Sequence, residues 1–219
     1  MSKHNKKKLY EDYKTYVKLL EDYTPEVIVG FDETGNGALA GPLCVAGCAL
    51  PIDYMGDIRD SKKYTESARE KAYDKVSKEA LMTKSFMAMP HLIEEAGHGA
   101  ALYELYRVAL LFFYAKYGDT AIYILDGNQH VRHSDVPHHC LVKGDDFVPA
   151  ISGASIVAKV ERDFVMAHTD LEGWNFATHK GYPTKEHLKM LEENGPVEGF
   201  HRMSIDRVRK AYEKNGWFK

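Results

Sequence analysis

The sequence has few cysteines and no long uninterrupted hydrophobic run. Its 219 residues include three cysteines, Cys44, Cys48 and Cys140, which cannot all pair with one another. We therefore expect no disulfide framework and a reducing compartment. The longest nearly apolar stretch, ALAGPLCVAGCALPI, contains two prolines and two glycines and is shorter than the ~20 residues of a membrane helix. The polar N-terminus does not resemble a signal peptide, so we expect a cytoplasmic protein without membrane contact.

A large net charge is also absent. The chain has 29 Lys and Arg residues against 32 Asp and Glu residues, a formal charge of −3 that indicates no partner by itself. The distribution is uneven, because residues 201–219 carry six Lys or Arg residues and two acids. A basic C-terminal segment of this kind can contact a polyanion. A solvated terminal helix explains the same charge equally well.

Strand-like runs are mixed with helical segments along the chain, and no repeat or linker divides it. We predict strands at 26–32, 41–50, 83–90 and 120–127, and helices at 8–22, from about 65 to 80, and at 99–117, 149–168, 184–193 and 205–214. Because 99–117 is apolar nearly all round, we expect that helix to be buried on most sides. The pattern predicts an α/β domain at 27–219 whose sheet is covered on both faces and whose C-terminal part is helical, after a helical lead-in at 1–26.

Acidic residues follow three strand-like stretches. Asp32-Glu33 end the first, Asp126 ends a second, and Asp145-Asp146 end a third, HHCLVKGDD at 138–146. Strand ends converge at one edge of an α/β sheet, so as many as four carboxylates would meet there. They would raise one another's pKa unless a cation neutralised them, and oxygen ligands suit Mg²⁺ or Mn²⁺. Turn or capping roles explain any single acid, whereas three such ends favour a shared site.

A glycine-rich turn, Gly35-Asn36-Gly37, follows the first pair of acids. Glycine lets the backbone approach a sugar-phosphate chain closely. A carboxylate cluster beside such a turn is typical of phosphoryl transfer by two metal ions ~4 Å apart. The turn lacks the Lys-[Ser/Thr] ending of a P-loop, which argues against ATP. A phosphodiester substrate is the leading interpretation, and a phosphomonoesterase or a kinase-like transferase also fits these residues.

A series of motifs resembles the ribonuclease HII family. They are, in order, DETGNGALAGP (32–42), DSKK (60–63), LDG (125–127), KGDDFVPAISGASIVAKVERD (143–163), HKGYPTKEH (179–187) and HRMS (201–204). The resemblance covers roughly residues 27–205. It implies an RNase H-like fold with a mixed sheet and a site for two Mg²⁺ or Mn²⁺ ions. It also implies an endonuclease that cuts the RNA strand of RNA/DNA hybrids, and the 5′ side of ribonucleotides embedded in duplex DNA, giving 5′-phosphate and 3′-hydroxyl ends.

The resemblance further implies roles for particular residues. The catalytic, metal-binding carboxylates would be Asp32, Glu33, Asp126 and Asp145, whereas Asp146 and Asp163 do not fall on catalytic positions. Tyr182 in GYPT matches the tyrosine that packs against the sugar next to the ribonucleotide, where an added 2′-OH would clash. Candidates for phosphate contact are Ser61, Lys62 and Lys143, although a solvated side chain explains each lysine as well.

The triplet at the glycine turn departs from the family's Gly-Arg-Gly, which grips the 2′-OH mainly through backbone atoms. Gly35-Asn36-Gly37 keeps the glycines, and asparagine tolerates positive φ, but the fixed charge and bidentate phosphate grip of arginine are lost. We therefore expect weaker substrate binding with a shallower salt dependence. The related ribonuclease HIII carries Gly-Lys-Gly and an additional N-terminal domain. The roughly 26 residues before the first strand are too few for that domain, so we expect the HII type.

Two alternatives stay open from the sequence: a nuclease that acts on long hybrids only, and a non-cleaving protein that binds hybrids. The stretch HVRHSDVPHHC at 130–140 is rich in histidine, but its spacing matches no standard zinc finger. We interpret it as a polar surface loop. The expected partners are RNA/DNA hybrid and ribonucleotide-containing duplex DNA, bound by a monomer.

Overall fold

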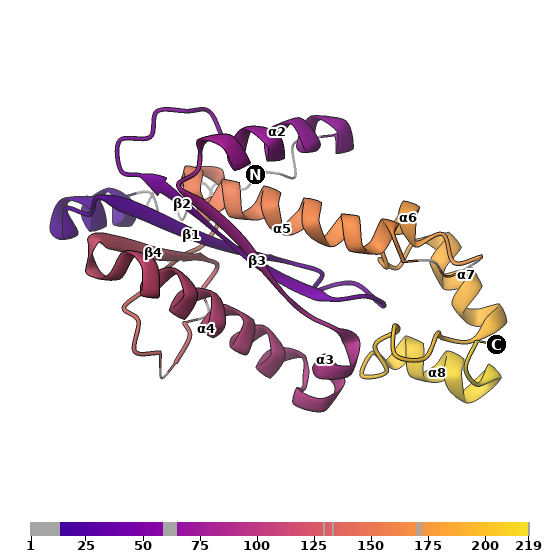
Figure 1. Ribbon diagram of the computed structural model, residues 1–219. Helices are drawn as coiled ribbons and strands as arrows, with labels where there is room; N and C mark the ends of the chain where they lie inside the picture. The colour runs from indigo at the N-terminus through magenta and orange to yellow at the C-terminus, as the bar shows by residue number, and fades with distance from the viewer. Residues whose placement is uncertain are drawn as a thin grey trace. The chain divides into compact units, whose positions relative to one another are not determined.

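The computed structural model describes residues 14–58, 65–128, 130–132, 134–169, 171 and 173–218. Within them a five-stranded sheet has the order β3-β2-β1-β4-β5, after a helical segment at residues 14–23. The strands are β1 (Val27–Thr34), β2 (Leu43–Pro51), β3 (Met82–Ala88), β4 (Ala121–Asp126) and β5 (His139–Leu141). The helices are α2 (Glu66–Glu79), α3 (Pro90–Ala96), α4 (His98–Tyr117), α5 (Pro149–Ala167), α6 (Phe176–His179), α7 (Lys185–Asn194) and α8 (Asp206–Asn215), with 3-10 turns η2 (Gly118–Thr120) and η3 (Gly144–Asp146). The predicted mixed sheet flanked by helices is confirmed (Figure 1).

The chain forms two compact units. The first, here called the sheet unit, comprises the described residues of 1–33, 45–86 and 106–160. The second, the helical unit, comprises those of 34–44, 87–105 and 161–219. The chain passes from the first unit to the second inside β1, between Glu33 and Thr34. The division expected at residue 26 is a different boundary, and it stays a prediction.

Within the sheet unit, parts of α4 and α5 cover opposite faces of β1. Gly30 and Phe31 are neighbours in this strand, so they face opposite ways. The Phe31 ring meets Phe113 of α4 edge-on, with ring centroids 5.5 Å apart. A Cβ atom at Gly30 would lie 2.3 Å from the backbone carbon of Ala150 in α5, so only glycine allows this approach. Figure 1 shows the resulting layers, with α4 on one side of the sheet and α5 on the other.

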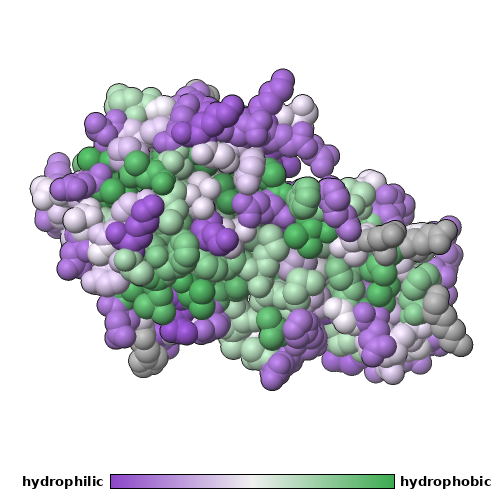
Figure 2. All heavy atoms as spheres, viewed as in Figure 1, coloured by the Kyte–Doolittle hydropathy of each residue, from purple (hydrophilic) through white to green (hydrophobic). Residues whose placement is uncertain are grey.

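The outward side of α4 is more exposed than its sequence predicts. Val108, Leu111 and Phe112 are 37%, 39% and 39% exposed, at i, i+3 and i+4 spacing. Figure 2 shows hydrophobic atoms gathered over this helix. The expectation of burial on most sides is therefore wrong for this stripe. The reason is geometric, because the sheet covers one side of α4 and no described element covers Val108, Leu111 and Phe112 fully.

Three local features differ from the sequence-based expectations. The short helices α3 and α6 were not predicted, and α6 spans only four residues, too few for helical periodicity to show. Asp145 and Asp146 do not end a strand, because β5 stops at Leu141 and both acids belong to η3. Other helix predictions are confirmed. The four longer helices predicted after residue 80 correspond to α4, α5, α7 and α8. The helix predicted from about residue 65 is α2, which begins after Thr65, whose hydroxyl accepts a hydrogen bond from the Ala68 N–H.

The helical unit has its own hydrophobic core. Its buried residues are Leu39, Ala40, Met166, Trp174, Phe176, Leu191, Phe200, Val208 and Ala211. Trp174 and Phe176 stack with ring centroids 5.7 Å apart and an interplanar angle of 5°. Residues 39 and 40, which follow the glycine-rich turn, belong to this core. The turn is therefore anchored by burial on its C-terminal side. Among the described residues, no helix has the length and apolarity needed to cross a bilayer.

Candidate active site

The ends of β1 and β4 bring predicted carboxylates together in the sheet unit. The two strands run parallel, with Phe31 opposite Leu125. Asp32 and Asp126 are the next residue in each strand, and Glu33 follows Asp32. The convergence expected from the sequence is thus observed for these three side chains, which interact electrostatically.

Asp32 is the buried member of this group, with 5% of its surface exposed. Burial raises its pKa well above the ordinary value, and the charges of Glu33 and Asp126 raise it further. Two hydrogen bonds act in the opposite direction, one from the Ser155 side chain and one from the Glu33 N–H, 2.8 Å from Asp32 Oδ1. They do not offset the other two effects, so ionised Asp32 calls for a nearby positive charge.

Tyr106 holds the second carboxylate. Its hydroxyl donates a hydrogen bond to Oε2 of Glu33, and its side chain is buried in α4. Burial, followed by the charges of Glu33 and Asp32, raises the pKa of Tyr106 well above the ordinary value, so the hydroxyl stays a donor. No sequence pattern indicates this role, because a tyrosine in an apolar helix resembles any other core aromatic.

The loop that carries Asp145 is tied to β4 and α5. The Gly144 N–H donates to Oδ1 of Asp126 over 2.8 Å, and the Ser152 hydroxyl donates to the Asp145 carbonyl over 2.7 Å. A Cβ atom at Gly144 would lie 2.4 Å from Cδ1 of Ile151, so a larger residue there would have to displace the Ile151 side chain. Asp145 itself is 3% exposed. These contacts hold the backbone of Asp145 in place, because the preceding residue, Gly144, is hydrogen-bonded directly to Asp126.

The structure does not test the metal site expected from the sequence. Among the described residues, no group of three or more His, Cys, Asp or Glu side chains has the geometry to hold a metal ion. The four-carboxylate site therefore stays a prediction. Of the expected phosphate contacts, Lys143 is exposed at the start of η3 with a left-handed φ of 59°. Ser61 and Lys62 lie outside the described residues.

The glycine-rich turn lies in the helical unit. Gly35 has a φ of +94°, and a Cβ atom there would lie 2.6 Å from Nε of Arg162 and 2.7 Å from the Pro42 carbonyl oxygen. Both the backbone angle and the space therefore require glycine. Asn36 and Gly37 are exposed, and a Cβ atom at Gly37 would meet nothing within 4 Å. The backbone of the turn is therefore packed against neighbouring atoms at Gly35 and is open to solvent at Asn36 and Gly37.

Tyr182 lies in the same unit as this turn. Its hydroxyl is 3.3 Å from the Thr34 hydroxyl, and the Arg162 guanidinium lies 5.1 Å from the centre of its ring. The neighbouring Gly181 accepts a hydrogen bond from the Leu39 N–H over 2.8 Å. The structure therefore brings Tyr182 and the residues flanking the glycine-rich turn together.

Two buried histidines support the Tyr182 loop. The Val197 N–H donates to Nδ1 of His201 over 2.9 Å, so the proton of that ring sits on Nε2. His201 Nε2 therefore donates to His187 Nε2 over 3.0 Å. This leaves the His187 proton on Nδ1, which donates to the Tyr182 carbonyl over 3.0 Å. Sequence reasoning placed both histidines inside motifs but assigned them no role.

Comparisons with known proteins show which family and which solved structures this chain resembles. The Ribonuclease HII family model matches residues 29–208. Ribonuclease H2 from Pyrococcus horikoshii OT3 is 21% identical, with a TM-score of 0.69 over 86% of this chain and 98% of that one. RNase HII from Archaeoglobus fulgidus, solved in complex with PCNA, is 25% identical, with a TM-score of 0.61 over 76% of this chain and 87% of that one.

A more distant structure shares the fold. Bst-RNase HIII in complex with Mn²⁺ is 15% identical, with a TM-score of 0.63 over 90% of this chain and 72% of that one. The RNase H-like fold expected from the motifs is therefore confirmed. Since the family model extends from β1 into α8 and so includes every predicted carboxylate, the protein belongs to the ribonuclease HII family and is a ribonuclease that acts on RNA/DNA.

Proposed function

We propose that this ribonuclease is a divalent-metal-dependent endonuclease of the HII type. It cuts the RNA strand of RNA/DNA hybrids and the 5′ side of a ribonucleotide embedded in duplex DNA, leaving 5′-phosphate and 3′-hydroxyl ends. The observation that carries the proposal is the burial of Asp32 against Glu33 and Asp126 where two parallel strands end. A protein that only bound nucleic acid would gain nothing from acids that repel one another and the phosphate backbone.

The residues suit hard divalent cations. Asp32, Glu33, Asp126 and Asp145 offer carboxylate oxygens, which Mg²⁺ and Mn²⁺ prefer. A cation at this place would also offset the repulsion that raises the pKa of Asp32. The Mn²⁺ in the structure of Bst-RNase HIII supports this choice of ion. When bound, two such ions activate a water molecule and stabilise the leaving oxygen.

The protein's own groups orient these acids before substrate arrives. Tyr106 restrains Glu33, and the Gly144 N–H restrains Asp126. Such restraint lowers the reorganisation that the transition state requires. We assign no side-chain nucleophile, because hydrolysis at a carboxylate-metal site uses water.

We assign recognition of the sugar to residues of the helical unit and contact with phosphates to three other residues. Tyr182 packs against the sugar beside the ribonucleotide, and Gly35, Asn36 and Gly37 offer their backbone to the 2′-OH, the group that separates RNA from DNA. Lys143, with Ser61 and Lys62, contacts phosphates. This assignment predicts selection by shape and backbone contact rather than by base sequence.

Replacing Asp126 by asparagine tests the proposal. Asp126→Asn keeps an oxygen that accepts from the Gly144 N–H and removes only the charge. Cleavage should fall on the order of 100-fold or more, with hybrid binding in EDTA retained. Asp146→Asn is the matched control, because Asp146 is an exposed neighbour in η3, and it should cleave like the wild type. Equal cleavage by the Asp126 variant and the wild type would refute the proposal. Binding without any cleavage by the wild type would favour the non-cleaving alternative.

A further inference from the structure

Arg162 is buried and donates to three backbone carbonyls of the helical unit. Its Nε donates to Pro42 over 2.8 Å, its Nη1 to Lys180 over 3.0 Å and its Nη2 to Ala40 over 3.2 Å. The side chain is fully buried. The guanidinium therefore ties the segment after the glycine-rich turn to the loop that carries Tyr182.

Arg202 grips the same turn through two other carbonyls. Its Nε donates to Gly41 over 3.0 Å and its Nη1 to Gly35 over 2.7 Å. Its Nη2 is buried and has no hydrogen-bond partner. Four of the five carbonyls that these two arginines hold belong to residues 35–42. The two arginines therefore hold the backbone of this turn from the buried side.

Carboxylates offset the charge of the two guanidiniums only in part. Asp163 interacts electrostatically with Arg162, and Glu94 with Arg202, but the side-chain hydrogen bonds of both arginines go to backbone carbonyls. Burial, and then the charge of Arg162, lowers the pKa of Arg202 to about 10, and Glu94 and Tyr182 offset this only in part. Glu94 instead accepts hydrogen bonds from Ser204, from its N–H and its hydroxyl, each over 2.8 Å. Two buried positive charges that repel one another and are only partly offset by nearby acids favour the approach of an anion.

We propose that Arg162 and Arg202 supply the positive potential of the glycine-rich turn and hold its backbone in shape, so that the turn binds a phosphate of the nucleic-acid backbone. Both are positioning residues, since each acts through the carbonyls it holds and is itself covered. A charge in a low-dielectric interior acts at longer range than a solvated one, and a guanidinium on a carbonyl polarises the peptide group. The exposed Asn36 brings no charge to this turn. The identity of the ligand rests on the proposed function.

Charge and shape are separated by two substitutions of one residue. Arg202→Gln keeps an amide donor for a carbonyl and removes the charge, whereas Arg202→Lys keeps the charge and loses the planar fork. The readout is the Kd of a labelled RNA/DNA hybrid in EDTA, measured over a range of salt concentrations. We expect Arg202→Gln to bind about 10-fold more weakly, with a salt slope smaller by about 1. Arg202→Lys should bind more tightly than Arg202→Gln and keep the wild-type slope.

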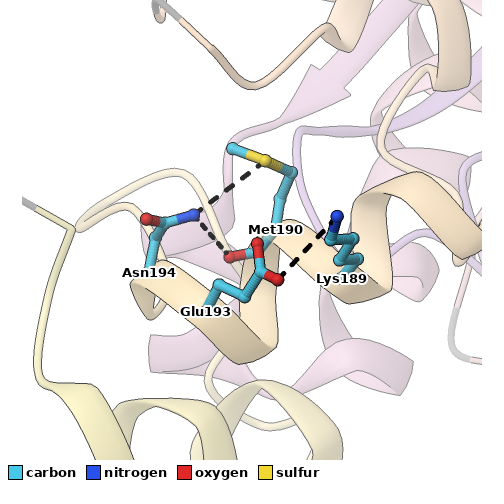
Figure 3. A network of polar contacts seen from close by, with 4 residues as sticks. All are labelled: Lys189, Met190, Glu193 and Asn194. Atoms are coloured by element: carbon cyan, nitrogen blue, oxygen red, sulfur yellow. Dashed lines mark hydrogen bonds and ion pairs between the residues drawn. The ribbon is translucent and has the colours of Figure 1, made fainter.

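The control is Lys189→Met, which removes an exposed cation of the same unit. Lys189 lies on α7 and pairs with Glu193 at 3.9 Å (Figure 3). Its Kd and salt slope should equal those of the wild type. If Arg202→Gln fails to fold, Arg162→Gln takes its place with the same expectation. Wild-type Kd and slope in a folded glutamine variant would overturn the proposal, as would equal slopes for the Gln and Lys variants.

Failure of this inference is distinguishable from failure of the proposed function. Binding in EDTA requires no cleavage, so a wild type that binds but never cuts would contradict only the nuclease proposal. A wild type that cuts, together with unchanged salt slopes in the arginine variants, would contradict only the inference. A wild type that does not bind the hybrid would contradict both.

Discussion

The hydroxyl group of Tyr106 donates a hydrogen bond to Oε2 of Glu33, and both residues belong to the sheet unit. Tyr106→Phe removes this bond and keeps the ring. Since a hydrogen bond to a charged group contributes about 1.5–3 kcal/mol, kcat should fall about 10- to 150-fold with little change in KM. Steady-state cleavage of a labelled hybrid measures both constants.

Tyr114→Phe is the control for this prediction. Tyr114 lies on the same helix, and its hydroxyl donates to Asp119 over 2.9 Å. Asp119 is in η2, at the opposite end of β4 from Asp126. The variant should keep the wild-type kcat. Equal rates for both phenylalanine variants would mean that Tyr106 does not restrain a catalytic group.

The two glycines of the turn should respond differently to alanine. Gly35→Ala forces a side chain onto a φ of +94° and places Cβ 2.6 Å from Nε of Arg162. We expect a loss of about 2–4 kcal/mol in unfolding free energy. Gly37→Ala meets nothing within 4 Å and should change stability by less than about 1 kcal/mol. Urea denaturation of both variants tests the difference, and equal stability would contradict the turn geometry described here.

Restoring a cation at the exposed position of the turn should strengthen binding. Asn36→Arg adds a guanidinium that can reach a phosphate, so KM should fall and the salt slope of binding should increase by about 1. Asn36→Gln, which adds length without charge, is the matched control. An unchanged or higher KM for the arginine variant would show that position 36 does not contact phosphate.

The buried histidines make stability depend on pH. Burial is the main cause that lowers the pKa of His187 to about 4 and that of His201 to about 3, from an ordinary 6.5. Between the folded values and 6.5, the unfolded chain binds more protons than the folded chain, so acidification favours unfolding. The contribution is complete above pH 6.5 and is lost as the pH falls toward 4.

Urea unfolding at pH 7.5 and pH 5 measures this loss. For the pair we expect on the order of 2–4 kcal/mol between these values. His201→Gln should show a smaller loss than the wild type, because one titrating group is gone. Identical pH dependence in the two proteins would exclude the histidine pair as its source.

The acids at the strand ends were predictable because their signal is local. An apolar run predicts each strand, and the acid follows it directly, so Asp32, Glu33 and Asp126 needed only the parallel pairing of β1 and β4 to meet. Asp145 was predicted near the same edge, but on a strand end rather than in η3. The register of a three-residue strand such as β5 leaves no periodic pattern in the sequence.

The supporting residues were not predictable, because their partners are distant in the chain. Arg162 reaches carbonyls 120 and 122 positions away, and Tyr106 reaches Glu33 across 73 positions. An arginine in a helix usually indicates a solvated face, and backbone carbonyls leave no trace in the sequence. The acids at the strand ends could thus be predicted directly, whereas the residues that hold them required the fold.

Cleavage of two labelled duplexes tests the central claim most directly. One contains a single ribonucleotide in DNA and the other is a continuous RNA/DNA hybrid, each incubated with Mg²⁺, Mn²⁺ or EDTA. The account predicts cleavage of both with a metal ion and of neither in EDTA, with a cut on the 5′ side of the lone ribonucleotide. Cleavage of the hybrid alone would show that the protein does not recognise a single ribonucleotide in DNA, and would assign that loss to the Gly35-Asn36-Gly37 turn. Undiminished cleavage in EDTA, or none of either duplex by folded protein with metal, would contradict the carboxylate-metal mechanism.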